Sequence, residues 1–139
     1  MHFCPYLSFD GRCAEALDFY SKTLSATVAI KVPFSQMPGD DAPIPENWKE
    51  KIMHAEWKIG DQQLMACDAP PQMYKSPHQG YSINLMLDEI SEAERIYEAL
   101  KQDGEVQMPL EESFFAHRFA MLTDQFGIPW MIAVLKQPE

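Results

Sequence analysis

The most constraining feature of this sequence is an internal repeat, in which an extended segment precedes an amphipathic helix twice. In the first copy, residues 3–9 alternate and are rich in aromatic side chains, which predicts a strand. Asp10–Gly11 interrupts that strand, and a helix is predicted over 13–24. The apolar residues of this helix fall at three- and four-residue spacings: Ala16, Leu17, Phe19, Tyr20 and Leu24. One buried stripe of this kind predicts a helix that lies on a sheet.

The second copy follows the same order. Residues 81–87 read as a strand, Ser91 is expected to cap the next helix, and Gly104 is expected to end it. The apolar stripe of this helix is Ala93, Ile96, Tyr97 and Leu100. The Glu-Ala pair and the tyrosine of the first helix recur here as Glu92–Ala93 and Tyr97. The chain is therefore expected to consist of two related halves.

Each predicted helix is followed by three further strand-like runs. They are 27–34, 52–59 and 63–68 in the first half, and 105–108, 119–123 and 129–134 in the second. Gly60–Asp61 predicts a hairpin, and residues 124–127 predict a longer turn with the same role. Both halves therefore read βαβββ. The predicted fold class is α+β, with one domain over 1–139 made of modules at about 1–70 and 80–139.

Composition narrows the classes of function. A chain of 139 residues with 46% hydrophobic content can bury a core. Its 21 acidic and 11 basic residues give a net charge of −10, which disfavours nucleic acid or an anionic membrane as a partner and favours neutral or cationic small ligands. No membrane span or secretory signal is expected. Three cysteines without a CxxC pair predict reduced thiols, so a cytoplasmic location is expected.

Four runs of residues resemble a known family. They are PYLSFDG with AEALDFY within 5–20, MHAEWKIGD at 53–61, MPLEESFF at 108–115 and TDQFGIPWMI at 123–132. Over nearly the full length, the chain resembles the PhnB-like branch of the glyoxalase, bleomycin-resistance and dioxygenase superfamily, the vicinal oxygen chelate proteins. The resemblance implies paired βαβββ modules whose eight strands curl round a cup-shaped cavity, commonly in a homodimer. Some members are described as demethylubiquinone methyltransferases, but this sequence has no glycine-rich strand-to-helix turn that would hold the usual methyl donor.

The superfamily's metal ligands match poorly suited residues of this chain. The resemblance implies His or Gln on the first strand of each module and Glu on the last, around a divalent cation with open positions. The matching positions are Cys4, Met65, Ser82 and Met131. Two thioethers, a thiol and a hydroxyl are poor ligands for a hard cation. We therefore expect no metal site and no cofactor, with a divalent metal held by other residues as the alternative.

Strand alternation predicts which side chains face the implied cavity, because every second residue points to the same side. In the first strand, Phe3, Leu7 and Phe9 are expected under the helix, and Cys4, Tyr6 and Ser8 on the cavity side. In the run 81–87, the cavity side is expected to hold Ser82, Asn84 and Met86. Tyr6, Ser82 and Asn84 are therefore candidate ligand-binding residues.

His54 and Glu56 are the candidate catalytic residues. They lie two positions apart in the run 52–59, on the face opposite Ala55 and Trp57, where Tyr6 or Gln63 is within reach across the sheet. An imidazole beside a carboxylate can act as a base near neutral pH. The same pattern also suits a partly buried, hydrogen-bonded histidine and an ordinary cross-strand pair.

The segment after residue 113 contains further candidate ligand contacts. Phe114–Phe115 precede His117 and Arg118 in a predicted loop. A guanidinium beside aromatic rings can clamp an anionic or planar ligand, so Phe114 and Arg118 are candidate ligand-binding residues, with plain loop packing as the alternative. Trp130 is expected in the core under the second helix.

Three functions remain open from the sequence. The first, which the acidic charge and the unsuitable metal ligands favour, is binding of a small molecule in a metal-free cavity. The second is an enzyme of the isomerase, lyase or dioxygenase type that uses His54 and Glu56 or a divalent metal. The third is a non-catalytic, partner-binding subunit that works through an exposed apolar edge. Whether the chain is an enzyme is not decided by the sequence.

Overall fold

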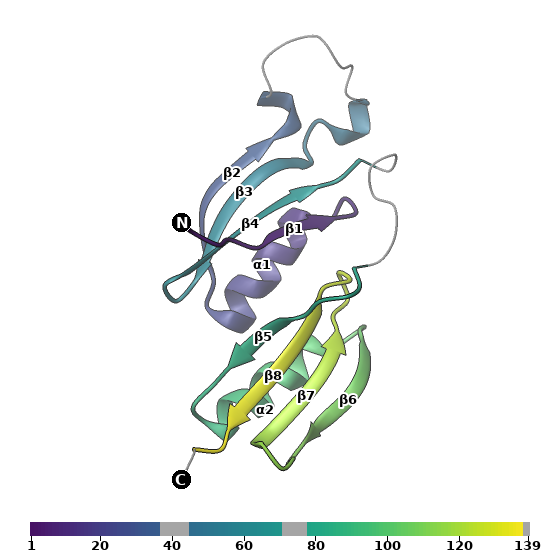
Figure 1. Ribbon diagram of the computed structural model, residues 1–139. Helices are drawn as coiled ribbons and strands as arrows, with labels where there is room; N and C mark the ends of the chain where they lie inside the picture. The colour runs from purple at the N-terminus through teal and green to yellow at the C-terminus, as the bar shows by residue number, and fades with distance from the viewer. Residues whose placement is uncertain (37–44, 71–77, 138–139) are drawn as a thin grey trace. The chain divides into compact units, whose positions relative to one another are not determined.

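The computed structural model describes residues 1–36, 45–70 and 78–137 (Figure 1). The chain divides into two compact units, Met1–Ser76 and Pro77–Glu139. Each unit contains one α-helix and one four-stranded sheet. Within the described residues, neither unit has a helix that is long and apolar enough to cross a membrane.

The first unit packs its helix on one face of a mixed sheet. Its elements are β1 (Tyr6–Phe9), α1 (Cys13–Leu24), β2 (Thr27–Pro33), β3 (Ile52–Ile59) and β4 (Gln62–Asp68). The strand order is β1-β4-β3-β2, with β1 parallel to β4 and the other neighbours antiparallel. Because α1 contacts β2, β3 and β4, the unit covers one face of its sheet with its own helix and leaves the other face open.

The second unit repeats this arrangement. Its elements are β5 (Ile83–Met86), α2 (Ile90–Leu100), β6 (Glu105–Glu111), β7 (Ala116–Thr123) and β8 (Pro129–Leu135). The strand order is β5-β8-β7-β6, and β5 is again parallel to the last strand. The predicted α+β class and the βαβββ repeat are confirmed, including the bounds 13–24 of the first helix.

Alternation along the strands builds the core of the first unit. The residues that face α1 are at most 4% exposed: Leu7, Phe9, Ala55, Trp57, Leu64 and Ala66. The prediction for Phe3 is wrong, since this residue precedes β1 and is 88% exposed. Pro5 explains the difference, because proline has no N–H to donate to a ladder and the strand begins only after it.

A buried aspartate organises the turn between β7 and β8. Asp124 is 3% exposed, and its Oδ1 accepts hydrogen bonds from the backbone N–H groups of Phe126 and Ile128 at 2.8 and 3.0 Å. Its Oδ2 accepts from Trp130 Nε1 at 2.8 Å, and Trp130 is fully buried as predicted. The TDQFGIPW run is therefore a structural turn with a satisfied core polar group.

The two helices begin in different ways. At α1, Asp68 of β4 supplies the cap, since its Oδ1 accepts from Cys13 N at 2.8 Å while its Oδ2 accepts from Ile52 N at 2.9 Å. At α2, the prediction of Ser91 as the N-cap is wrong. The chain is still extended at Glu89, and the helix begins at Ile90 without a side-chain cap, so Ser91 lies within the first turn.

Candidate functional site

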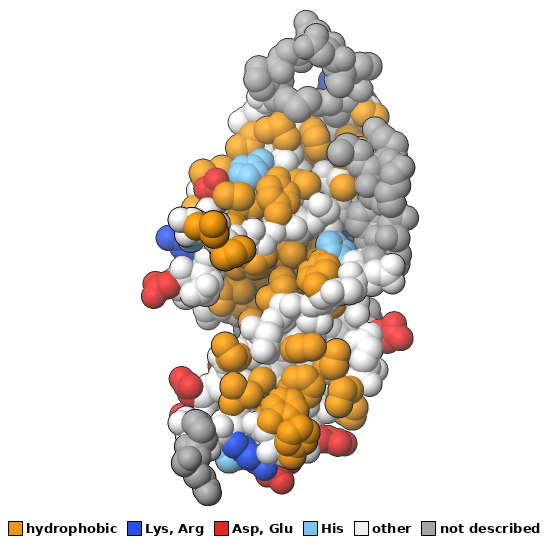
Figure 2. Space-filling view, in the orientation of Figure 1, with side chains coloured by type: hydrophobic (Ala, Val, Ile, Leu, Met, Phe, Trp, Pro, Cys, Tyr) orange, Lys and Arg blue, Asp and Glu red, His pale blue; other side chains and the backbone are white. Residues whose placement is uncertain are grey.

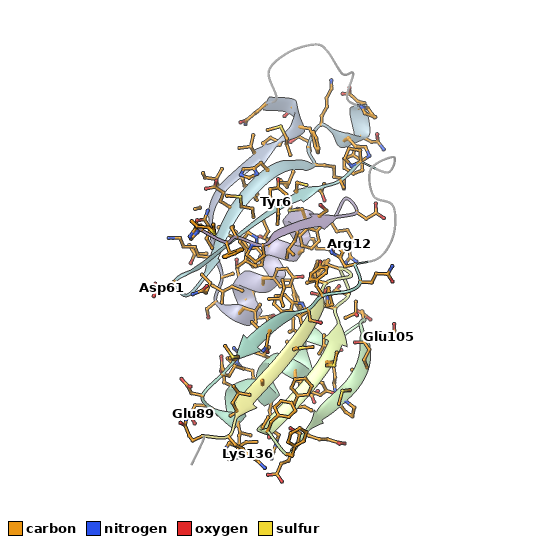
Figure 3. All side chains as sticks on the ribbon, in the orientation of Figure 1. Tyr6, Arg12, Asp61, Glu89, Glu105 and Lys136 are labelled. Carbon is orange, nitrogen blue, oxygen red and sulfur yellow. The ribbon has the colours of Figure 1, made fainter. Side chains whose placement is uncertain are left out.

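The face of the first sheet that α1 leaves uncovered carries polar and sulfur-containing side chains. It is termed the first open face and consists of Tyr6, Ser8, His54, Glu56, Met65 and Cys67. Strand register brings them together, because Tyr6 and Glu56 both lie opposite Met65. Figure 2 shows histidine and hydrophobic side chains side by side over the strands of this sheet, and Figure 3 labels Tyr6 there.

Three of these side chains form a hydrogen-bonded chain. The Tyr6 hydroxyl and His54 Nδ1 are 3.0 Å apart, and His54 Nε2 and Glu56 Oε1 are 3.3 Å apart. The rings of Tyr6 and His54 also contact each other, with centroids 5.8 Å apart. The side chains of His54 and Glu56 are 30% and 28% exposed, so both are partly open to solvent. Of the two residues predicted to meet this pair across the sheet, Tyr6 contacts His54.

The donors and acceptors in this chain are set by its chemistry when His54 is neutral. An ionised carboxylate only accepts, so His54 Nε2 carries the proton and donates to Glu56, and Nδ1 accepts from the Tyr6 hydroxyl. Desolvation, with the neighbouring Cys67 thiol as the next cause, raises the pKa of Tyr6 to about 12, although 49% of the residue is exposed. Tyr6 therefore keeps its proton at neutral pH, and its oxygen can still accept a hydrogen bond from a ligand.

A thiol lies beside this chain. Ser8 and Cys67 are register partners on β1 and β4, and Ser8 Oγ lies 3.9 Å from Cys67 Sγ. The cysteine pattern of the sequence predicts only a reduced thiol at Cys67 and does not place it at the site. The alternation of Gln63, Met65 and Cys67 along β4 was the signal that would have found it, because alternate residues share a face.

The corresponding face of the second sheet is mainly apolar. It is termed the second open face and consists of Asn84, Met86, Met108, Phe119, Met121 and Met131. Asn84 lies opposite Met131, which lies opposite Met121. Asn84 is exposed, and Ser82, just before β5, is partly exposed, so both are accessible to a ligand of this unit.

The structure places Phe114 and Arg118 differently from each other. The predicted loop ends before Arg118, because β7 begins at Ala116, which pairs with Leu135 of β8. Arg118 therefore lies in β7 and not in a loop. The Arg118 guanidinium donates to the carbonyl oxygen of His117 at 2.6 Å. Phe114 is 92% exposed and stacks edge-on against Phe115 at 5.2 Å. Ligand contact by Phe114 and Arg118 stays a prediction.

His117 belongs to a hollow at one end of the second sheet. The hollow has a volume of about 420 Å³ and is lined by Met86, Leu87, Asp88, His117, Val134, Leu135 and Gln137. Its polar groups are a carboxylate, an imidazole and an amide, without a lysine or arginine. Local sequence patterns do not predict this hollow, since its lining comes from three separate strand ends.

The side chains at the superfamily's metal positions do not fit a hard divalent cation. Cys4 directs its thiol at the carbonyl oxygen of Gln63, at 3.4 Å, and Met65 offers only a thioether. Ser82 and Met131 add a hydroxyl and a second thioether. Within residues 1–36, 45–70 and 78–137, no group of three or more His, Cys, Asp or Glu side chains is arranged to hold a metal ion.

A family model described as 3-demethylubiquinone-9 3-methyltransferase matches residues 1–133. That description implies a methyl donor, which a glycine-rich turn at a strand-to-helix junction would hold. The junctions are Asp10-Gly11-Arg12 before α1 and Leu87-Asp88-Glu89 before α2. They contain one glycine between them, so neither is the glycine-rich turn that lets a backbone approach such a cofactor. The residues present therefore do not fit the methyl donor.

Full-length relatives place the chain in its family. It is 35% identical to Protein YjdN of Escherichia coli K12, over 99% of this chain and 97% of the relative. It is 41% identical to the crystallised protein PA1353 of Pseudomonas aeruginosa, with a TM-score of 0.85 and 99% of both chains covered. A glyoxylase/bleomycin resistance protein/dioxygenase domain from Frankia shares the fold, with a TM-score of 0.66, 11% identity and 98% of both chains covered. The chain belongs to the PhnB-like family, whose model is described as 3-demethylubiquinone-9 3-methyltransferase.

Proposed function

We propose that the protein binds a small molecule on the first open face without a metal ion. The observation that carries this proposal is the Tyr6-His54-Glu56 chain, which presents hydrogen-bonding groups on a face that the unit's own helix leaves uncovered. Strands hold these groups in fixed positions, and Met65 supplies a soft apolar floor between Tyr6 and Glu56. Few polar groups on an apolar floor are typical of a small-molecule site.

The charges of this face favour a neutral or cationic ligand that donates hydrogen bonds. Glu56 contributes a carboxylate that is 28% exposed, and the Tyr6 oxygen has accepting lone pairs. The whole chain carries a net charge of −10, which repels anions approaching from solvent. Asn84 and Ser82 on the second unit, with Phe114 and Arg118, are proposed as further ligand contacts of that unit.

A panel of small molecules, screened by thermal shift, tests the proposal. Compounds that raise the melting temperature of the wild type should lose most of that effect in Tyr6→Phe and Glu56→Gln, while the unliganded melting temperature stays within a few degrees. Tyr81→Phe is the matched control, because Tyr81 and His78 form a tyrosine-histidine hydrogen bond in the second unit. Full retention of the responses in Tyr6→Phe and Glu56→Gln would move the site away from this face.

An enzyme is the second candidate, and the hydrogen bonds on both His54 nitrogens favour it. Glu56 accepts a hydrogen bond from the imidazole and orients it, as an acid-base catalyst requires. An isomerase or lyase reaction fits such a pair. If this is the function, His54→Gln should abolish turnover while retaining binding, and equal loss of both would make His54 a binding residue only. A partner-binding subunit remains the third candidate.

We also propose that the protein acts as a cytoplasmic homodimer. The three cysteines are free thiols, which suits a reducing compartment. On the second open face, Met86 and Met108 are 67% and 48% exposed, and a second copy can bury such apolar surface.

A further inference from the structure

Three methionines stand in one row across the sheet of the second unit. Met108 of β6 lies opposite Met121 of β7, and Met121 lies opposite Met131 of β8. The side chains of directly opposite residues point to the same face of a sheet, with their Cβ atoms about 5 Å apart. The three thioether groups therefore lie side by side on the second open face, with Met121 between the other two.

A register shift in the edge strand β6 brings the third methionine into this row. Val106 lies opposite Leu122, so an unbroken ladder would put Gln107 opposite Met121. The shift after Val106 puts Met108 there instead, and the Gln107 amide donates to a threonine hydroxyl of β7 at 3.2 Å. Such irregularities re-aim side chains and are frequent beside functional sites. The row therefore depends on a local irregularity of the backbone and not on strand alternation alone.

The row is open to solvent. Met108 is 48% exposed, and Met121 and Met131 are partly exposed. Methionine is normally among the buried residue types, where its adaptable side chain fills gaps in a core. Core packing by the unit's own helix does not explain these three side chains, since they lie on the face that α2 leaves uncovered. Their thioether sulfur atoms are accessible to a small solute.

Carboxylates flank the row on the same face. Glu105 and Glu111 of β6 lie opposite Thr123 and Phe119, which share the face of Met121 by alternation along β7. The second open face as defined has no lysine or arginine, and the whole chain carries a net charge of −10. The uncharged sulfur atoms therefore lie in a negative potential, which attracts a cation.

We infer that Met108, Met121 and Met131 bind a soft monovalent cation, Cu⁺, through their thioether sulfur atoms. Soft thioether ligands select Cu(I), whereas hard divalent ions prefer oxygen ligands. Each methionine side chain has three rotatable bonds, so the two outer sulfur atoms can lean towards the central one and contact the same ion. This site lies on a different sheet from the proposed small-molecule site, and the inference does not rest on that function.

Binding of Ag⁺, a redox-inert probe with the charge and softness of Cu⁺, tests the inference on the full-length chain. The partly exposed thiols of Cys4 and Cys67 would also bind this ion, so the protein carries Cys4→Ser and Cys67→Ser. Native mass spectrometry should find one Ag⁺ per chain. In NMR spectra of isotope-labelled methionine methyl groups, only the three resonances of the row should shift, among the nine methionines of the chain. Cu⁺ added without oxygen should displace Ag⁺.

Two further substitutions separate the row from the rest of the face. Met121→Leu removes the central sulfur atom and keeps an apolar side chain of similar volume, so the fold should be retained. Its affinity for Ag⁺ should fall by about tenfold or more. Met86→Leu is the matched control, because Met86 is 67% exposed on the same face and lies opposite Ala133, outside the row. Its affinity for Ag⁺ should not change.

Several results would overturn the inference. They are no retained Ag⁺, methyl shifts confined to other methionines, and equal Ag⁺ affinities in Met121→Leu and Met86→Leu. One ion for every two chains would also overturn it, because a row within a single chain binds one ion per chain whether or not the protein is a dimer. Failure of Cu⁺ to displace Ag⁺ would refute the assignment to copper.

Discussion

Two buried tryptophans show how single residues differ between the halves of the repeat. Trp57 of β3 lies opposite Leu64 of β4, whereas Leu122 of β7 lies opposite Trp130 of β8, so the same pair of residues is exchanged between the strands. Trp130 Nε1 donates to the Asp124 carboxylate at 2.8 Å. Trp57 stacks on Tyr20 at 5.4 Å, and among the described groups its Nε1 has no hydrogen-bond partner.

This difference predicts unequal costs for the same substitution. Trp130→Phe removes a hydrogen bond to the buried carboxyl group of Asp124, while Trp57→Phe removes a donor that has no hydrogen-bond partner among the described groups. The free energy of unfolding should therefore fall by about 1–3 kcal/mol more in Trp130→Phe than in Trp57→Phe. Urea denaturation measures both. An equal or larger loss in Trp57→Phe would show that ring volume alone decides the cost.

Asp68 is the residue with a predictable effect of pH on stability. Burial raises the pKa of its carboxyl above the ordinary value of 3.8, although the backbone N–H groups of Ile52 and Cys13 act in the opposite direction. The folded state therefore binds the proton more tightly than the unfolded state. The stabilisation from this group is complete below the unfolded pKa and is lost as the pH rises through the folded pKa.

Comparison of the wild type with Asp68→Asn isolates this effect. The asparagine side chain does not titrate, and it keeps only one of the two oxygens that accept from Cys13 N and Ile52 N. The variant should therefore be less stable than the wild type at every pH at which Asp68 is protonated. The difference in unfolding free energy should widen as the pH falls from 7 towards 4, because only the wild type gains from protonation. Denaturant titrations at several pH values measure it, and a difference that narrows towards acid would contradict the assigned direction.

At the scale of elements, the end of α2 depends on a close backbone approach. The sequence predicts that Gly104 ends this helix, but α2 ends at Leu100 and the left-handed residue is Asp103, with φ of 57°. A Cβ on Gly104 would lie 2.4 Å from the carbonyl oxygen of Thr123. Glycine is needed here because the chain passes directly against β7, and not because of its dihedral angles.

Gly104→Ala should therefore destabilise the protein by about 2 kcal/mol, as an overpacking change does. Thr123 cannot retreat easily, because it is a paired residue of β7. Gly60→Ala is the control: its Cβ would meet nothing within 4 Å, and only the strain of φ at 60° remains, roughly 1 kcal/mol. Thermal unfolding ranks the two variants. A smaller loss in Gly104→Ala than in Gly60→Ala would disprove the close-approach explanation.

At the scale of the whole molecule, the side chains at the four expected metal-ligand positions predict whether the protein binds a hard metal ion. Cys4, Met65, Ser82 and Met131 at the superfamily's positions suit no hard cation, so native mass spectrometry should find no stoichiometric nickel, manganese or ferrous iron after incubation with each. The same spectra report the number of subunits, expected to be two. One retained metal ion per chain would require ligands outside these positions and would favour the enzyme. A monomer at micromolar concentration would refute the proposed homodimer.

The sequence by itself determined the repeat, the helix over 13–24 and the faces of most strands, because hydrophobic periodicity is a local property that each segment carries alone. It also identified His54, Glu56 and Tyr6 as residues of one face. Tertiary structure alone decided that Asp68 caps α1 from a distant strand and that Gly104 meets β7. Each of these depends on register between segments far apart in the sequence, and register follows from how the strands pack together.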